Sequence, residues 1–335
     1  MAKWYDDTGF QNDIVLSTRV RLARNLKGIP FPRKITEEDA KEVIQKVEVA
    51  LKEANLGFAK TDIASTEASE LQKLVEKRYI SPNFASQTKP AALFVSADES
   101  LAVMVNEEDH IRMQAIFAGF ECQRAYEIIS GLDECVAQKA EYAIHPKYGY
   151  LTSCLTNAGT GMRISCMMHL PALCKSNMAE SLFAALGKLG ITVRGMYGEG
   201  SKASGYLFQI SNQMTLGISE KEIADRMNDV VNQLITKERE LRQALLRQDT
   251  AAVEDKIMRS VGILKTARLL SNKEMLTLFS NVRMGISLGL VDQIKPKTLN
   301  KLMVETSPNH LAISDPRERD ILRAKTVRSV LESEV

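Results

Sequence analysis

Four short segments of this sequence bring together side chains that could do chemistry. The first is Ser17-Thr18-Arg19-Val20-Arg21. In a β-strand, Arg19 and Arg21 point to the same face. Two guanidinium groups on one face suit a polyphosphate, because each binds phosphate oxygens in bidentate fashion. Taken alone, the segment is more simply interpreted as a solvated basic strand at a sheet edge.

The second segment is acidic and reads NEEDHIR from residue 106 to 112. It directly follows the apolar run Leu101–Val105, which predicts a strand. Carboxylates placed where a strand ends are typical of catalytic or metal-binding positions. An ordinary acidic turn is the alternative.

The third segment, from residue 150 to 163, surrounds Cys154 with hydroxyl side chains and ends in a Gly-Thr-Gly turn. Nearby cations and hydroxyl donors lower the pKa of a thiol toward the thiolate. A buried structural cysteine beside a turn is the alternative. The five cysteines are odd in number, scattered and without a CxxC pair, which argues against a disulfide framework or a zinc site and favours a reducing cytoplasm.

The fourth segment is VRGMYGEGSKASG, from residue 193 to 205, with Glu199 in its middle. Mobile glycine-rich loops often close over substrates. A surface loop with a solvated glutamate is the alternative. The sequence has neither a Walker A loop nor GxGxxG, so any nucleotide must be held by other means.

The elements around these segments predict an α+β catalytic domain over residues 1–217, followed by an all-helical domain over residues 218–335. Strands are expected at 91–96, 101–106, 150–153, 162–169, 191–197 and 206–211. Helices are expected at 36–55, 120–142, 181–189, 219–247, 250–270, 273–290, 297–306 and 316–331. From about residue 219 onward glycine becomes scarce and helical periodicity dominates.

Composition excludes several classes of protein. The net charge of +2 argues against a general nucleic-acid binder. No apolar run approaches the ~20 residues that a membrane span needs. The first residues carry Asp6 and Asp7 and lack an apolar core, so no signal peptide is expected and the predicted location is the cytoplasm.

Together and in this order, the segments resemble the ATP:guanidino phosphotransferase family, which includes creatine and arginine kinases. The matching pieces are STRVR, NEEDHIR, CxTNxGTGxR and RGxxGE. The stretches VLSTRVRLARNLKGIPFP, YLTSCLTNAGTG, MMHLPAL and RGMYGEGSKASGYLFQISNQ resemble the branch of McsB-type bacterial protein arginine kinases. The resemblance covers nearly the whole chain. It implies an antiparallel sheet flanked by helices, of the glutamine-synthetase-like type, before the helical domain.

The resemblance also implies which residues hold ATP, with Mg²⁺ carried by the nucleotide and no metal site of the protein's own. An arginine cage fits phosphoryl transfer, whose transition state needs charge stabilisation and in-line positioning. Arg78 stands where the branch often has His. The residues implied are Ser17, Thr18, Arg19, Val20, Arg21, Arg78, Arg112, Arg163, Ile164, Ser165, Cys166, Met167, Arg194, Gly195, Met196, Tyr197 and Gly198.

Three residues are implied at the acceptor guanidinium: Glu108, Glu199 and Cys154. A free guanidinium has a pKa far above neutral pH, so neutralising it at neutral pH costs about 9 kcal/mol. The two carboxylates instead align the nitrogen with the γ-phosphorus and accept its proton late, and alignment is worth ~7–11 kcal/mol. The family usually has Pro after the cysteine, whereas this chain has Leu155, which changes the local backbone constraint.

Domain order favours a protein substrate. Kinases of small guanidino compounds carry a helical domain before the catalytic domain, whereas here the first motif already begins at Ser17. We therefore expect phosphorylation of arginine side chains that are exposed on proteins. A kinase of free arginine and a non-catalytic phosphoarginine-binding adaptor are the alternatives.

The tail contains Arg319-Asp320-Ile321-Leu322-Arg323-Ala324, which matches the RDxxRA motif of the McsB branch. The resemblance implies a phosphoarginine-binding pocket for allosteric control, formed by Arg319, Asp320, Arg323 and Ala324. On a helix, the two arginines share a face. The resemblance further implies a McsA-type activator, a Clp ATPase partner, a stress-response repressor as target, and a homo-oligomer of at least two copies.

Overall fold

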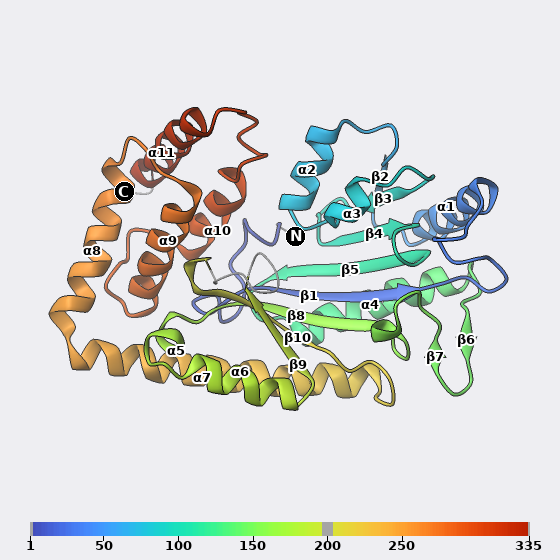
Figure 1. Ribbon diagram of the computed structural model, residues 1–335, viewed down its shortest axis with the longest axis horizontal. Helices are drawn as coiled ribbons and strands as arrows, with labels where there is room; N and C mark the ends of the chain where they lie inside the picture. Colours follow the sequence, from blue (N-terminus) through green and yellow to red (C-terminus); the bar gives the residue numbers. More distant parts are fainter. Residues whose placement is uncertain (1–2, 196–203, 334–335) are drawn as a thin grey trace.

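A computed structural model describes residues 3–195 and 204–333 of the chain. Its centre is an antiparallel sheet with the strand order β2-β3-β4-β5-β1-β8-β10-β9 (Figure 1). These strands are β1 (Val15–Arg24), β2 (Ala59–Asp62), β3 (Ala92–Val95), β4 (Leu101–Val105), β5 (Ile111–Ala118), β8 (Met162–His169), β9 (Ile191–Gly195) and β10 (Leu207–Asn212). A separate hairpin pairs β6 (Ile144–His145) with β7 (Gly149–Tyr150).

Helices cover the sheet and continue beyond one end of it (Figure 1). In the first part of the chain they are α1 (Glu37–Glu53), α2 (Ala68–Glu76), α3 (Pro82–Ala85), α4 (Cys122–Ala137), α5 (Pro171–Lys175) and α6 (Ala179–Lys188). In the second part they are α7 (Glu220–Gln248), α8 (Thr250–Thr266), α9 (Asn272–Ser287), α10 (Pro296–Glu305) and α11 (Pro316–Ser333). Two short 3-10 turns, Leu155–Asn157 and Ser204–Tyr206, complete the described elements.

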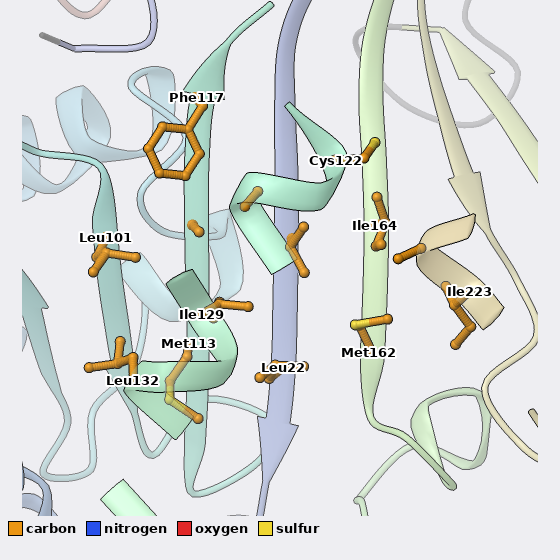
Figure 2. Close-up of a cluster of buried hydrophobic side chains, with 14 of the residues drawn as sticks. Leu22, Leu101, Met113, Phe117, Cys122, Ile129, Leu132, Met162, Ile164 and Ile223 are labelled. Atoms are coloured by element: carbon orange, nitrogen blue, oxygen red, sulfur yellow. The ribbon is translucent and has the colours of Figure 1, made fainter. Parts of the chain in front are cut away.

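One face of the sheet forms the main hydrophobic core. Leu22 of β1, Met113 of β5 and Ile164 of β8 meet α4 there, as Figure 2 shows. Alternate residues of a strand point to opposite faces, so this core leaves the odd-numbered positions of β1 from Ser17 onward, after a shift of register, on the other face. The apolar core therefore fixes which side of the sheet is open for chemistry.

The helix α7 joins the two parts of the chain. Its buried residues, from Ile223 to Ile235, belong to the same core as the sheet. A second core lies on the other side, where Leu16 and Met167 of the sheet join a cluster that extends through α8–α11. The division at residue 217/218 stays a prediction.

The predicted elements are largely confirmed, with three differences. Thr36 caps α1 by accepting a hydrogen bond from Asp39 N at 3.1 Å, and Ser271 caps α9 in the same way. The strand expected at 150–153 is wrong, because only Gly149–Tyr150 pairs. The helices expected at 120–142 and 250–270 end earlier, at Ala137 and Thr266. The sequence analysis did not anticipate β2, β5, β6, α2, α3 and α5.

Candidate active site

The five arginines expected to hold phosphates come from four strands and lie on one face of the sheet. They are Arg19 and Arg21 of β1, Arg112 of β5, Arg163 of β8 and Arg194 of β9. Directly paired residues of an antiparallel ladder project from the same face. Arg21 pairs with Arg163, and its strand neighbour Ala23 pairs with Arg112. The ladder thus gathers three of these arginines around the end of β1.

The other two arginines follow the same register. Arg19 pairs with Ser165 of β8. Gln209 of β10 pairs with Met167 on one side and with Arg194 on the other, which carries this face across to β9. We call this set of five residues the arginine cage.

Two hollows open on the cage face. One, of about 160 Å³, is lined by Ser17, Ser165, Met167 and Gln209 together with Arg19 and Arg78. The other, of about 250 Å³, is also lined by Arg19 and Arg78, and its further residues include Arg21, Ser81, Arg112 and Gln114. The predicted ATP residues Ser17, Ser165 and Met167 therefore share a cavity with the cage.

Arg78 is held at the cage by its backbone and by aromatic contact. Its backbone is left-handed, with φ of 68°, and its carbonyl accepts a hydrogen bond from Gln114 Nε2 at 2.9 Å. The guanidinium lies 4.8 Å from the ring centroid of Trp4, which is within the range of a cation–π contact. The structure therefore brings this residue, whose type departs from the branch, to the same site.

Burial and mutual repulsion lower the pKa values of two arginines of the cage. Burial, followed by the charges of Arg78, Arg112 and Arg163, lowers the pKa of Arg19 to about 9. Burial and three neighbouring arginines also lower the pKa of Arg21 well below its ordinary value. Because arginine stays protonated in proteins, these shifts express the cost of holding like charges together. In the described part of the chain, Arg21 Nε is buried without a hydrogen-bond partner.

A bound polyanion would neutralise the repulsion between the cage arginines. It would also accept hydrogen bonds from guanidinium donors such as Arg21 Nε. The residues present therefore fit the triphosphate of ATP.

Glu107 balances one side of the cage. Its Oε2 lies 2.5 Å from Arg112 Nη1, and its Oε1 accepts a hydrogen bond from Ser81 Oγ at 2.6 Å. Burial raises the pKa of the Glu107 carboxyl, but Arg112 and the hydrogen bonds outweigh burial, and the net pKa is lowered. Glu107 is thus a fixed anion that orients Arg112, a role that the sequence analysis did not assign.

The segments that carry the predicted acceptor residues Glu108 and Cys154 are joined through the carboxylate of Asp109. Asp109 is 2% exposed. Its Oδ1 accepts hydrogen bonds from Asn25 Nδ2 at 2.6 Å and from Ser153 N at 2.7 Å. The acidic turn is therefore tied directly to the residue before Cys154.

Glu108 itself is exposed at the tip of the turn between β4 and β5. Partial burial, and then the charge of Asp109, raises the pKa of its carboxyl. A carboxylate with a raised pKa is a better proton acceptor than an ordinary one.

Cys154 stands at the beginning of the 3-10 turn Leu155–Asn157 and is half-buried. Its Sγ lies 3.0 Å from Thr156 Oγ1. Thr215 Oγ1 secures this turn by hydrogen bonding to the carbonyl oxygens of Thr156 and Ala158, at 2.9 and 2.7 Å. Leu155, which replaces the usual Pro, is 88% exposed.

Four residues expected to contact ATP have side chains on the opposite, apolar side of the sheet. They are Thr18, Val20, Ile164 and Cys166, each 0% exposed. The Thr18 hydroxyl, for example, donates to Gly119 O at 2.7 Å. Their side chains are separated from the cage by the sheet itself, so contact with ATP stays a prediction for their main chain alone.

The expected loop residues Met196, Tyr197, Gly198 and Glu199 lie outside the described residues. Gly195, also expected to bind ATP, is the last residue of β9.

The expected phosphoarginine residues lie on α11. Arg323 is 1% exposed, and its guanidinium donates to Thr306 O and Leu270 O, both at 2.9 Å, and also meets Asp320. Ala324 is also buried, while Arg319 donates to Ile313 O at 3.3 Å. The guanidinium of Arg323 is therefore engaged with carbonyl groups of two neighbouring segments in the interior. Binding of phosphoarginine by this segment stays a prediction.

Comparison with known proteins agrees with this geometry. A family profile described as "ATP:guanido phosphotransferase, C-terminal catalytic domain" matches residues 40–241, and one described as "Protein-arginine kinase McsB C-terminal domain" matches residues 250–334. The chain belongs to the ATP:guanido phosphotransferase family, and it is an enzyme of the phosphotransferase class.

Within that family, its relatives are named protein-arginine kinases. One from Clostridium acetobutylicum is 44% identical over 309 residues, covering 91% of each chain. Another from Bacillus subtilis is 42% identical over 344 residues, covering 100% of this chain and 94% of the relative. The recognition made from the four sequence segments is confirmed.

Solved structures confirm the fold. A lombricine kinase matches with a TM-score of 0.63 at 24% identity, covering 70% of this chain and 69% of its own. A duplicated taurocyamine kinase from Schistosoma mansoni matches with a TM-score of 0.62 at 22% identity, covering 82% of this chain and 41% of its own. In residues 3–195 and 204–333, no helix is both long and apolar enough to cross a bilayer.

Proposed function

We propose that this chain transfers the γ-phosphoryl group of ATP to arginine side chains of proteins. The observation that carries the proposal is the pairing register, which sets five arginines on one sheet face, together with the hydrogen bond that ties the Glu108 turn to the segment of Cys154. The names of the relatives support arginine in proteins as the acceptor.

The proposed reaction follows from these positions. A guanidinium nitrogen of the acceptor arginine attacks the γ-phosphorus, and an N–P bond forms as the P–O bond to the β-phosphate breaks. ADP leaves with that bonding pair, and the nitrogen's proton passes to Glu108, whose carboxyl has a raised pKa. The cage stabilises the charge on the phosphoryl oxygens. A magnesium ion bound to the nucleotide adds further charge stabilisation.

Glu199 and Cys154 complete the proposed acceptor site. Glu199 supplies the second carboxylate that aligns the guanidinium, and the thiol of Cys154 supplies a polar contact beside it. Alignment of the reacting groups contributes a large part of the rate in such a reaction, beside charge stabilisation by the cage.

The direct test is incubation with ATP and either an arginine-rich unfolded protein or free arginine. Phosphoarginine is then sought by mass spectrometry under non-acidic conditions, with Glu108→Ala as the comparison. We expect protein-bound phosphoarginine with the wild type and a large loss with the variant. Phosphoarginine found only as the free amino acid would support a kinase of free arginine. The absence of any phosphoryl transfer would support a non-catalytic adaptor that binds phosphoarginine.

The finer parts of the resemblance are proposals of the same kind. They are a cytoplasmic location, marking of substrates for a Clp-type protease, action on a stress-response repressor, a McsA-type activator, self-association, and allosteric control by phosphoarginine at the α11 segment. Co-purification with an activator and a Clp ATPase, each with and without ATP, would test the partners.

A further inference from the structure

The turn that carries Cys154 presents an unusually exposed apolar side chain. Leu155 is 88% exposed, more than any other large apolar side chain in the described ranges 3–195 and 204–333. A single exposed leucine is ordinary on a protein surface. Leu155, however, is the residue directly after the thiol of the proposed acceptor site.

Two other segments, 189–190 and 214–216, also expose apolar side chains. Leu189, Met214 and Leu216 are 66%, 47% and 50% exposed. We name Leu155, Leu189, Met214 and Leu216 together the apolar rim. Grouped exposed apolar side chains mark interaction sites more often than isolated ones do.

Backbone contacts bring the members of the rim together. Thr215, which lies between Met214 and Leu216, donates to the carbonyl of Thr156, the residue after Leu155. A Cβ placed on Gly159 would lie 2.8 Å from Leu216 Cα, so these two segments touch through their main chains. The same kind of close approach joins Gly190, beside Leu189, to the side chain of Met214, at 2.9 Å.

The rim is also held in a fixed shape. Asn212 Nδ2 donates to Met214 O at 3.1 Å and to Met162 O at 3.1 Å, and Asn212 is only 5% exposed. Thr160 N donates to Thr215 O at 2.9 Å. These polar groups are hydrogen-bonded to one another in the interior and fix the backbone beneath the exposed apolar side chains. A backbone that is already ordered lowers the entropy cost of binding.

The position of the rim relative to the acceptor site suggests its occupant. Leu155 directly follows Cys154, which the proposed function places at the acceptor guanidinium, and Asp109 ties the Glu108 turn to Ser153. The residues that flank the acceptor arginine in an extended chain then pass over the rim. Free arginine has no flanking residues and would leave the rim uncovered.

We propose that the apolar rim binds apolar side chains next to the acceptor arginine and so selects arginines in apolar sequence contexts, such as those of unfolded protein segments. This inference rests on the proposed function, since it requires a polypeptide acceptor. The driving force is the removal of apolar surface from water on both partners.

The experiment compares two peptides of equal length that differ only in the residues flanking one arginine, leucine in one and serine in the other. The enzymes are the wild type, the double variant Leu155→Ser/Leu216→Ser, and the control Leu56→Ser. Leu56 is 44% exposed and lies near the opposite sheet edge, its carbonyl accepting a hydrogen bond from Ala97 N. Phosphoarginine formation gives kcat and KM for each pair.

We expect the wild type and the control to favour the leucine-flanked peptide by about tenfold in kcat/KM. The double variant should lose this preference through a higher KM for that peptide, with its thermal unfolding unchanged. The conservative variant Leu155→Met should keep the preference.

Three results would overturn the inference, two of them without affecting the proposed function. Equal use of both peptides by the wild type, or a preference kept by the double variant, overturns the rim alone. Failure of the wild type to phosphorylate either peptide or an unfolded protein, while it phosphorylates free arginine, overturns the proposed function and the rim with it.

Discussion

Strand β1 carries arginines on both faces of the sheet, and the surroundings on the two faces shift their pKa values in opposite directions. Arg21 lies in the cage, where burial and three neighbouring arginines lower its pKa. Arg24, three residues later, points to the other face. Burial alone would lower the pKa of Arg24, but Asp133 and Glu220 outweigh it and raise the pKa.

The contacts of Arg24 explain the difference. Its guanidinium lies 2.7 Å from Asp133, 3.1 Å from Glu220 and 3.5 Å from the ring centroid of Tyr150. It also donates to Thr160 O at 2.8 Å. A buried cation that is fully paired belongs to the architecture, whereas cations crowded together against their own repulsion belong to a site that awaits a ligand.

The largest effect should come from Arg21→Ala. We expect kcat/KM for phosphoryl transfer to fall by about 10³-fold or more, because an arginine at the transferred group is worth that much. The melting temperature should stay unchanged or rise, since one repelling charge is removed. ATP should raise the melting temperature of the wild type but not of this variant. A variant with near-normal activity would contradict the cage.

The second change, Arg24→Ala, should act on stability instead. Removing this cation leaves Asp133 and Glu220 facing each other in a buried place, and breaking such pairs costs about 3–5 kcal/mol. Denaturant unfolding would measure the loss, with Arg21→Ala as the matched arginine control on the same strand. Equal unfolding free energies for the two variants would remove the distinction between the faces.

The arginines of the cage could be predicted from the sequence more completely than the strands that carry them. Alternation along β1 was enough to place Arg19 and Arg21 on one face, and the resemblance supplied the other three arginines. The strand β5 was missed, although Ile111, Met113, Ala115 and Phe117 alternate in a way that indicates a strand. That signal was available in the sequence.

Other features could not be read from one sequence. The segment after Tyr150 has strand-like residues. Its Ser153 N, however, donates to the side chain of Asp109, which lies 44 positions earlier, and not to the backbone of a neighbouring strand. A tertiary hydrogen bond thus overrode local preference. The pairing of Arg24 with Glu220, separated by 196 positions, is of the same kind.

The third prediction sharpens the comparison within the acidic turn. Asp109→Ala would leave Ser153 N and Asn25 Nδ2 without their acceptor and free the Glu108 turn from the Cys154 segment. We expect activity to fall by about 10²-fold, the scale of a small misplacement of reacting groups. Stability should fall by about 1–3 kcal/mol.

Asp98→Ala is the matched control for this change. Asp98 likewise accepts hydrogen bonds in a turn, from Ser96 Oγ at 2.7 Å and Ser100 N at 3.0 Å, but at the opposite end of β4. This variant should lose stability while keeping its activity. If both variants lose activity equally, the link between Asp109 and the acceptor site is refuted.

The smallest effect concerns the pH dependence of stability and should have opposite signs at Glu108 and Asp98. Partial burial and Asp109 raise the pKa of Glu108, so its ionised form costs stability, and Glu108→Gln should be slightly more stable than the wild type at neutral pH. That difference should vanish below about pH 4, where the carboxyl is protonated in both the folded and unfolded states.

Burial raises the pKa of Asp98, but hydrogen bonds from Ser96 and Ser100 lower it on balance, so Asp98→Asn should be less stable at neutral pH. Its deficit should shrink as the pH falls through the lowered pKa of Asp98. Melting curves over this pH range would measure both, and curves of the same sign would show that the acidic turn is stabilised by Glu108 rather than strained by it.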